Sequence, residues 1–332
     1  MEILNNAVIT YDCIKASVDV TEKELADFSV EKGDILFQRS SETLEDVGRA
    51  NVYMDDKTAV FGGFVIRGKK KGEYDPQYFN YLLRSPFARK RIIPMGAGAQ
   101  HFNIGQEGLS KVKLHFANIE EQKKIGKMLS LLDERISTQN KIIDKLQSLI
   151  KGISSRIFAS IQGIEYRMGD IVTITNGNSN VQDAVTQSKD GLYPFFDRSE
   201  DIKYLPTFLF DKEAIIYPGE GTEFMPRYFK GKFALHQRCY AIFDFNEIIN
   251  ARFLYFYLKT RNSYFVKNAV GSTVPSLRLD TFQKLKVIIP PKKIQHSVSL
   301  CLSSMEQKCN VEKKILHKLL KQKQYLLRQM FI

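Results

Sequence analysis

The chain has 332 residues, enough for two domains of roughly 100–150 residues each together with long helices. Its formal net charge is +12, from 49 Lys and Arg against 37 Asp and Glu, and such a basic chain indicates contact with phosphate. No apolar run approaches the roughly 18 residues that span a bilayer, and residues 1–5 do not form a secretion signal. We therefore expect a cytoplasmic protein without membrane contact.

The first part of the chain reads as mixed and mostly β. Short apolar stretches bounded by glycine or charged turns predict strands at residues 34–37, 51–54, 59–61 and 64–66. Pro76 suits the first turn of a helix, which stops near Pro86 or Pro94. A glycine-rich loop follows at 96–101, and a final strand is expected at 112–114.

A long heptad helix is predicted next, from about residue 119 to residue 158, with a length of roughly 60 Å. Its mostly apolar seam positions are spaced alternately by four and three, with Gln139 as the polar member between Ile136 and Ile143, so they form one seam that must pack against another helix. The seam residues are Ile125, Leu129, Leu132, Ile136, Ile143 and Leu146.

The second half of the chain repeats the first. Residues 32–36 correspond to 212–216, and residues 78–83 correspond to 253–258. A second heptad series starts at Val298, which lies 173 residues after Ile125. A period this long indicates two similar domains rather than a solenoid. The second seam consists of Val298, Leu302, Met305, Leu316, Leu319 and Leu326.

These elements predict an α+β fold. Two tandem domains, mixed and mostly β, are separated by two long helices that pair as an antiparallel coiled coil in a pseudo-twofold repeat. The expected divisions are 1–117 and 161–291 for the domains, and 118–160 and 292–332 for the helices. By comparison with the second copy, about two dozen residues are missing from the start of the first domain. We expect either a reading frame that begins late or a truncated first domain.

The positive charge lies mostly on the two helices, whereas residues 1–117 and 161–291 are nearly neutral. The excess charge either contacts phosphate or forms a solvated helix face, and the sequence leaves both interpretations open. Within the domains, basic residues gather at 69–71, 84–91 and 227–238. Local patches of this kind can position a protein on DNA.

No motif for catalysis or metal binding is present. The chain lacks the G-x-x-x-x-G-K-[ST] phosphate loop and the Asn/Asp-Pro-Pro-aromatic motif of amino-methyltransferases. Its five histidines show no ligand spacing. We expect no catalytic residue, metal or cofactor in this chain. The four cysteines form no Cys-x-x-Cys pair and are expected to be reduced, buried packing residues: Cys13, Cys239, Cys301 and Cys309.

Residues 120–125, Glu-Glu-Gln-Lys-Lys-Ile, precede Leu132-Asp133 at the start of the first long helix. This pattern is similar to the Pro-Pro-x-x-Glu-Gln-x-x-Ile…Leu-x-x-Asp pattern of the specificity subunits of type I restriction-modification systems. The chain resembles that family over essentially its whole length. Residues 116–118 replace the prolines of the first copy, and Ile294 replaces the glutamate of the second.

The resemblance implies a non-catalytic DNA-binding subunit. Each domain would be a target recognition domain that reads one half of a split sequence in double-stranded DNA, and the helices would fix the spacer. Two modification subunits would supply S-adenosylmethionine and adenine methylation, and restriction subunits would supply ATP hydrolysis and cleavage with Mg²⁺. Partner subunits would dock at Glu121, Gln122 and Gln295.

Base discrimination requires polar side chains presented from loops at the edge of a sheet. Ordinary polar loop residues are the alternative interpretation at each position. The candidates of the first domain are Asp12, Arg39, Ser40, Ser41, Gln100, His101 and Asn103. The candidates of the second domain are Arg198, Thr222, Arg227, Ser272, Thr273, Ser276 and Arg278.

Three alternatives remain open. The chain could be a coiled-coil scaffold that binds no specific DNA, or an enzyme whose active site has no recognisable motif. Within the family, it could be a truncated or recombining allele that is silent until its first domain is exchanged.

Overall fold

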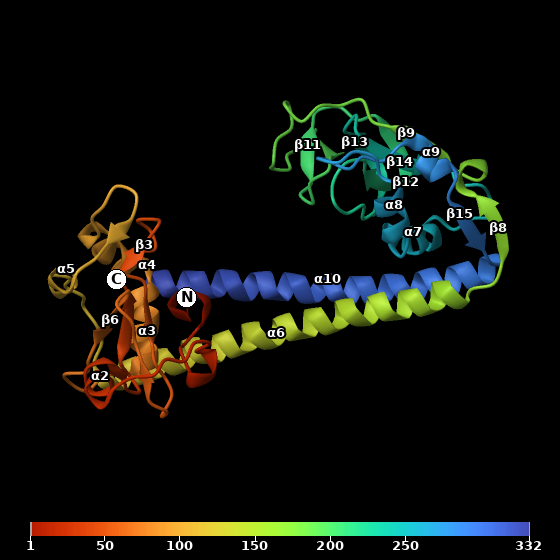
Figure 1. Ribbon diagram of the computed structural model, residues 1–332. Helices are drawn as coiled ribbons and strands as arrows, with labels where there is room; N and C mark the ends of the chain where they lie inside the picture. Colours follow the sequence, from red (N-terminus) through yellow and green to blue (C-terminus); the bar gives the residue numbers. More distant parts are fainter. Residues whose placement is uncertain (1, 332) are drawn as a thin grey trace. The chain divides into compact units, whose positions relative to one another are not determined.

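The computed structural model describes residues 2–331, which fall into two compact units (Figure 1). Unit 1 combines the chain up to Lys141 with the chain from Lys313 onward, and unit 2 is Ile142–Glu312. Two long helices, α6 (Ile119–Ser160) and α10 (Lys292–Gln329), each contribute one part to each unit. The predicted divisions kept both helices whole, whereas the compact units divide them.

Unit 1 contains small antiparallel sheets and short helices. Its elements before α6 are α1 (Glu2–Asn5), η1 (Tyr11–Cys13), α2 (Glu22–Phe28), β1 (Ser29–Val30), β2 (Ile35–Gln38), β3 (Ser40–Ser41), β4 (Ala50–Val52), β5 (Ala59–Val60), β6 (Val65–Gly68), α3 (Pro76–Arg84), α4 (Pro86–Ile92), η2 (Ile93–Met95), β7 (Phe102–Asn103) and α5 (Gln106–Ser110). Three strands form a sheet in the order β4-β2-β6, and the other pairs are β1-β5 and β3-β7. Strands β2, β4, β5 and β6 lie within two residues of their predicted positions.

Helix α3 connects this sheet to the long helix α6. Asp75 caps the helix, since its Oδ1 accepts a hydrogen bond of 2.7 Å from the backbone N–H of Tyr78. The buried residues Tyr78 and Leu82 then pack in one apolar cluster with Ile125 and Leu129 of α6. The amphipathic pattern that predicted this helix therefore also determines which face docks on the long helix.

The predicted strand at residues 112–114 is wrong. The matching segment of unit 2 is β15 (Lys286–Ile289), which pairs with β8 (Ile164–Arg167). Among the described residues of unit 1, no segment takes the place of β8, so residues 112–118 have no partner for a ladder. Leu114 is instead held by packing against the apolar clusters of unit 1. Apolar patterning alone cannot form a strand without backbone partners.

Unit 2 has a larger sheet. Its remaining elements are η3 (Met168–Asp170), β9 (Thr173–Asn176), β10 (Tyr193–Phe196), β11 (Lys203–Leu205), β12 (Phe210–Pro218), β13 (Arg227–Leu235), β14 (Cys239–Phe243), α7 (Ala251–Lys259), α8 (Asn262–Asn268) and α9 (Leu279–Gln283). Six strands follow the order β11-β10-β13-β12-β14-β9. All neighbours are antiparallel except β10 and β13.

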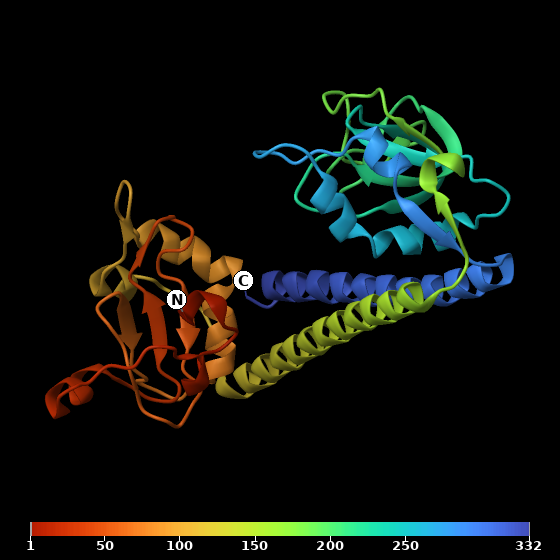
Figure 2. The ribbon, with the colours of Figure 1, turned by 45° about the vertical axis from the view of Figure 1, so that its right-hand side comes forward.

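The sheet of unit 2 has two apolar faces, because alternate residues of a strand point to opposite sides. Ile215 and Tyr217 of β12 face a core that also contains Phe253 and Phe256 of α7. Helices α7 and α8 cover this side of the sheet (Figure 2). Ala214 and Ile216 face a separate aromatic cluster, which includes Phe210 and Phe233. The strand ends are thereby fixed in position on a sheet that is packed on both sides.

The two long helices pack against each other antiparallel within each unit. In unit 1, Ile125 and Leu129 share a cluster with Leu326 and Phe331 from the end of the chain. In unit 2, Phe158 from the end of α6 shares a core with Leu302 from the first half of α10. Every predicted seam residue is buried or half-buried. The mixed sheets and long helices confirm the α+β class.

Candidate nucleic-acid interface

The structure brings together several base-reading candidates of unit 1. Strand β3 pairs with β7, with Ser40 opposite Asn103 and Ser41 opposite Phe102. The Ser40 hydroxyl donates to Asn103 Oδ1 across 2.5 Å. Arg39 precedes this pair, and its carbonyl accepts a hydrogen bond of 2.9 Å from Ile104 N. We call Arg39, Ser40, Ser41 and Asn103, with the loop 97–102, the polar edge of unit 1.

Gln100 and His101 lie in the loop of this polar edge, and both are exposed. The loop is closed by two hydrogen bonds between the backbones of Ala97 and Asn103, at 2.9 and 2.8 Å. Gly98 within it has φ +143°, a conformation that L side chains rarely adopt. The loop therefore presents Gln100 and His101 to solvent from a closed backbone.

Asp12 does not belong to the polar edge of unit 1. It lies exposed in η1, where the neighbouring Tyr11 N–H donates to Asp55 at 3.0 Å. Val52, shortly before Asp55, pairs with Ile35 at the start of β2, whereas Ser40 follows the end of that strand. Asp12 is thus at the opposite end of the sheet from the other candidates.

The turn 197–199 of unit 2 is held by a dense set of hydrogen bonds. The Ser199 N–H and hydroxyl both donate to Asp197 Oδ1, at 2.8 and 2.5 Å. Lys203 Nζ donates to Asp197 Oδ2 at 2.6 Å. Burial opposes the charged carboxylate, but these hydrogen bonds outweigh it and hold the pKa of Asp197 below its ordinary value. Asp197 therefore stays ionised and fixes the turn.

Arg227 lies behind this turn rather than on the outer surface. Its guanidinium donates to the carbonyl of Ser199 at 2.9 Å and to the carbonyl of Asp197. It also lies over the Phe196 ring, 5.0 Å from the centroid. Burial lowers the pKa of this guanidinium. Arg227 was predicted to contact bases. Its two terminal guanidinium nitrogens instead donate to backbone carbonyls within unit 2, so Arg227 positions the turn.

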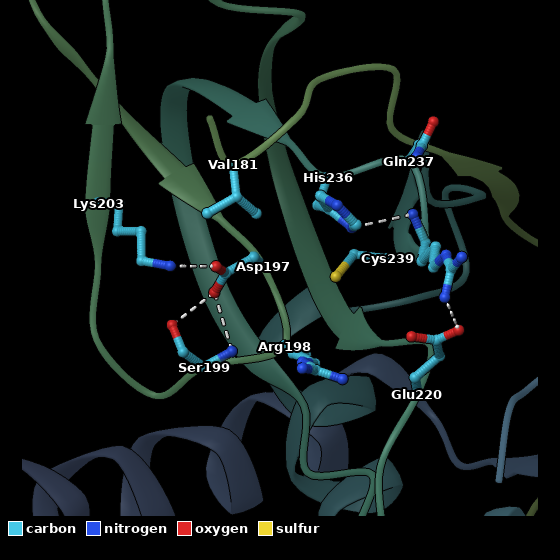
Figure 3. Close-up of a pocket in the computed structure, with 10 residues that line it drawn as sticks. Val181, Asp197, Arg198, Ser199, Lys203, Glu220, His236, Gln237 and Cys239 are labelled. Atoms are coloured by element: carbon cyan, nitrogen blue, oxygen red, sulfur yellow. Dashed lines mark hydrogen bonds and ion pairs between the residues drawn. The ribbon is translucent and has the colours of Figure 1, made fainter. Parts of the chain in front are cut away.

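A groove of about 530 Å³ opens beside the turn 197–199 (Figure 3). Arg238 and Glu220 form an ion pair of 2.5 Å on one side of it. His236 Nδ1 accepts from the Arg238 N–H at 3.3 Å, and burial lowers the pKa of this imidazole. The residues that line the groove are Val181, Asp197, Arg198, Ser199, Lys203, Glu220, His236, Gln237, Arg238 and Cys239.

The loop 270–278 runs beside the groove. Ser276 bridges to Glu220, and Leu277 N donates to the carbonyl of Gly219 at 2.8 Å. Ser276 and Val270 exchange two backbone hydrogen bonds of 2.9 Å, which close the loop. Four predicted candidates extend from these segments as exposed side chains: Thr222, Ser272, Thr273 and Arg278. Arg198 lines the groove, whereas these four residues do not belong to its lining.

Comparison with known proteins identifies the family. A family model described as Type I restriction modification DNA specificity domain matches residues 1–148 and 164–321. The chain belongs to this family. The predicted resemblance is confirmed, and so is the prediction that the chain is not itself an enzyme, because specificity subunits of type I systems are non-catalytic.

Individual relatives agree with this assignment. The chain is 30% identical over 123 residues to the type I restriction enzyme EcoDI specificity subunit of Escherichia coli, covering 37% of this chain and 26% of that protein. It is 31% identical over 144 residues to the putative type I restriction enzyme MjaX specificity subunit of Methanocaldococcus jannaschii, covering 42% and 33%. The chain thus spans a third or less of the length of these two curated relatives.

A solved structure shows the same fold. The S subunit of the type I restriction-modification system from M. genitalium matches with a TM-score of 0.64 at 19% identity. The match covers 92% of this chain and 84% of that chain. At this identity the likeness concerns the fold alone.

Two residues expected to bind partners of this specificity-domain chain are used internally. Gln122 Oε1 accepts from the Asp75 N–H at 2.9 Å, and its Nε2 donates to the carbonyl of Ala117 at 2.7 Å. Gln295 Oε1 accepts from the Asn250 N–H at 2.7 Å. Both side chains are buried, at 2% and 0% exposure. Glu121 is exposed and stays a candidate for partner contact.

The four cysteines were predicted to be buried packing residues, and the structure confirms this for two of them. Cys239 and Cys309 are buried as expected, whereas Cys13 is half-buried and Cys301 is exposed. Cys301 is adjacent to Leu302 in α10, and the seam residue Leu302 is the one that points into the core, so the cysteine is left exposed.

Among residues 2–331, no helix is long and apolar enough to cross a membrane.

The sequence prediction missed the turn 236–238, which supplies three residues of the groove. A signal for it existed, since His-Gln-Arg separates the apolar ends of β13 and β14. Three polar residues between two strand-like runs are typical of a turn at a sheet edge. This specificity domain therefore presents more polar side chains at its groove than the sequence prediction selected.

Proposed function

We propose that this chain is the DNA-recognising specificity subunit of a type I restriction-modification complex. The observation that carries the proposal is that a chain of this family has polar loops gathered at one sheet edge in each of its two units. Loops on a rigid sheet suit base readout, because their side chains can enter a groove of DNA without rearranging the fold.

We propose further that each unit reads one half of a bipartite site and that the paired long helices set the spacer between the halves. Two kinds of support exist. The chain contains two units of related sequence, and α6 has 42 residues, about 63 Å at 1.5 Å per residue. This is comparable to about two turns of B-DNA at about 34–36 Å each.

Catalysis in this proposal belongs to partner subunits. Two modification subunits would bind S-adenosylmethionine and methylate adenine, and restriction subunits would use ATP and Mg²⁺. The exposed Glu121, at the start of α6, is a candidate contact for them. The complex would act on double-stranded DNA in the cytoplasm, and the positive charge of the chain favours that substrate.

Methylation mapping tests this proposal. A host that carries this gene with its neighbouring modification gene is sequenced for methylated adenine and compared with a host that lacks only this gene. A split motif of two short half-sites, present only with this chain, is the expected result. A palindromic motif would mean that one unit alone reads DNA in a dimer. No new methylation would favour a silent allele or a scaffold without specific DNA binding.

A further inference from the structure

Most polar side chains around the groove of unit 2 already have partners inside the unit. Lys203 is paired with Asp197 at 2.6 Å, and Arg238 is paired with Glu220 at 2.5 Å. Within the described part of the chain, the side chains of Arg198 and Gln237 are the long polar groups of the groove without a hydrogen bond or ion pair. These two side chains can therefore bind an external ligand without breaking an internal contact.

The backbone that carries Arg198 is fixed from two sides. Asp197 accepts from the N–H and hydroxyl of Ser199, and Arg227 binds the carbonyls on both sides of Arg198. Arg198 itself is exposed at the centre of the turn, and its side chain is part of the groove lining (Figure 3). The turn thus holds one free guanidinium on a rigid support.

The backbone that carries Gln237 is fixed in a similar way. Its N–H donates to the carbonyl of Ser179 at 3.2 Å, and its carbonyl accepts from Asn176 Nδ2 at 3.3 Å. The turn is closed by a 2.8 Å hydrogen bond from Cys239 N to the carbonyl of His236. The exposed amide of Gln237 is therefore presented from a turn that is tied to the segment 176–179 at the end of β9.

Because both backbones are already fixed, binding has to order only the two side chains, and the turns limit the positions that these side chains can reach. In the major groove, Arg makes paired hydrogen bonds to O6 and N7 of guanine, and Gln makes them to N6 and N7 of adenine. We infer that Arg198 and Gln237 read bases for unit 2, Arg198 a guanine and Gln237 an adenine of duplex DNA. Asp197, Glu220 and Arg227 hold these readers in place. The inference rests on the proposed function and names the residues that carry its specificity.

Selection from a randomised duplex pool tests the inference. The full chain, purified with its modification subunits, is used to select DNA at fixed salt, and the bound duplexes are sequenced. For Gln237→Ala we expect loss of an A·T preference at one position of one half-site, with the other half-site unchanged. Arg198→Ala should likewise lose one G·C preference. Affinity for the preferred duplex should fall about 5- to 150-fold in each variant.

Matched controls come from the same unit. Gln162 and Arg167 are exposed residues before and within β8, away from the groove lining. Gln162→Ala and Arg167→Ala remove the same chemical groups and should leave the selected motif unchanged. These controls distinguish the loss of a base-contacting side chain from the general effect of removing an exposed charge or amide.

Two further substitutions test whether these side chains determine which base is preferred, because they should change or keep a base preference without removing the side chain. Gln237→Glu should shift the preference at its position from A·T toward C·G, because a carboxylate accepts from cytosine N4. Arg198→Lys should keep the preference for guanine, since Lys also binds O6 and N7. Altered preference with retained binding cannot arise from misfolding.

Three results would overturn the inference. Equal loss of affinity for all sequences would mean that the residues contact phosphates. An unchanged motif in both alanine variants would place base reading elsewhere while the proposed function stands. If the wild-type chain itself selects no motif, the proposed function fails together with the inference.

Discussion

The buried side-chain amides of Gln122 in α6 and Gln295 in α10 link each long helix to a short helix of the same unit. Each accepts a hydrogen bond from the N–H of the residue that caps the following helix, Asp75 of α3 or Asn250 of α7. Gln295 Nε2 also donates to the carbonyls of Ile248 and Pro290, both at 2.8 Å. One side chain thus pairs with three backbone groups, of which the carbonyl of Pro290 is buried and the other two are partly buried.

Gln295→Ala should therefore lower the free energy of unfolding of unit 2 by about 2–4 kcal/mol, because three buried or partly buried backbone groups lose their partner. Urea denaturation followed by circular dichroism measures the change. Gln307→Ala, at an exposed position of the same helix, should change stability by less than about 0.5 kcal/mol. Equal effects of the two substitutions would contradict the buried role of Gln295.

Asp197 makes stability depend on pH in a defined direction. Its folded-state pKa is lowered below 3.8, so its contribution to stability is full above pH 3.8 and is lost as pH falls through the folded-state value. Asp197→Asn should therefore cost about 1–2 kcal/mol at pH 7, and the difference from wild type should shrink below about pH 4. Denaturation curves at pH 7, 5, 4 and 3 measure this. Asp211→Asn, at an exposed position of β12, is the control.

The cysteines should react with a thiol reagent in the order of their exposure. Burial raises the pKa of the Cys239 thiol to about 11, so almost no thiolate is present at pH 8. Cys301 is exposed and should be labelled first in the native protein. Mass spectrometry of the labelled peptides measures the order. Rapid labelling of Cys239 without denaturant would mean that the part of the groove lining that contains Cys239 opens readily in the native protein.

At the scale of elements, the same contact joins the short helix to the long helix in both units. In unit 1, the Tyr81 hydroxyl donates to Asp133 of α6 at 2.8 Å, and Lys323 lies 2.5 Å from the same carboxylate. In unit 2, the Tyr255 hydroxyl donates to Glu306 of α10 at 2.8 Å, with Lys259 at 2.9 Å. Each carboxylate has both a phenol and an ammonium partner, which offsets its partial burial.

Helix α6 also contains two glycines with opposite roles. A Cβ at Gly126 would lie 2.6 Å from Asp75 Oδ1 and 3.0 Å from Tyr78 N, whereas nothing lies within 4 Å of a Cβ at Gly152. Ala stabilises a helix by about 1 kcal/mol relative to Gly. Gly152→Ala should therefore raise the thermal midpoint slightly. Gly126→Ala should lower it, because the clash at the cap of α3 exceeds the gain in helix propensity. Calorimetry of the two variants measures both signs, and a stabilising Gly126→Ala would contradict the close approach of α3.

The sequence predicted the elements better than it predicted their contacts. The heptad spacing located both long helices, since that periodicity is encoded locally. The strand at 112–114 failed because a ladder depends on a partner segment elsewhere in the chain. The contact of Ser40 with Asn103 spans 63 residues and depends on the fold. The sequence likewise could not predict that the side chains of Arg227 and Gln295 bind backbone groups of unit 2, because it gives the type of a residue but not the direction of its side chain.

At the scale of the molecule, the two units repeat one scheme: a sheet with polar loops, a capped helix and parts of two long helices. The internal sequence repeat predicted this architecture correctly, because a repeated pattern must fold in a similar way twice. The repeat also predicted that about two dozen residues are missing from the start of the first domain, but it did not predict how much the sheets of the two copies differ. Unit 2 has a six-stranded sheet, whereas the largest sheet described in unit 1 has three strands.

Lengthening both long helices should change the spacer of the DNA site without changing the half-sites. One heptad adds about 10.5 Å to a helix, equal to about three base pairs at about 3.4 Å each. Insertion of one heptad in both α6 and α10 should therefore lengthen the spacer by about three base pairs, as measured by methylation mapping. Insertion in α6 alone is the control and should abolish the motif, because the seams no longer match. Altered half-sites in the double insertion would contradict the division of labour between loops and helices.

The division of both long helices between the units has a consequence for synthesis. Unit 2 is one continuous stretch of chain, whereas unit 1 combines the beginning of the chain with its last residues. Phe331 packs its ring against Tyr78 with centroids 5.3 Å apart, so the core of unit 1 includes a residue that is translated after the whole of unit 2. Since a ribosome releases the N-terminal residues first, unit 2 can mature while unit 1 is still incomplete. Of the two units, the one whose translation starts earlier is thus the one whose core is completed later.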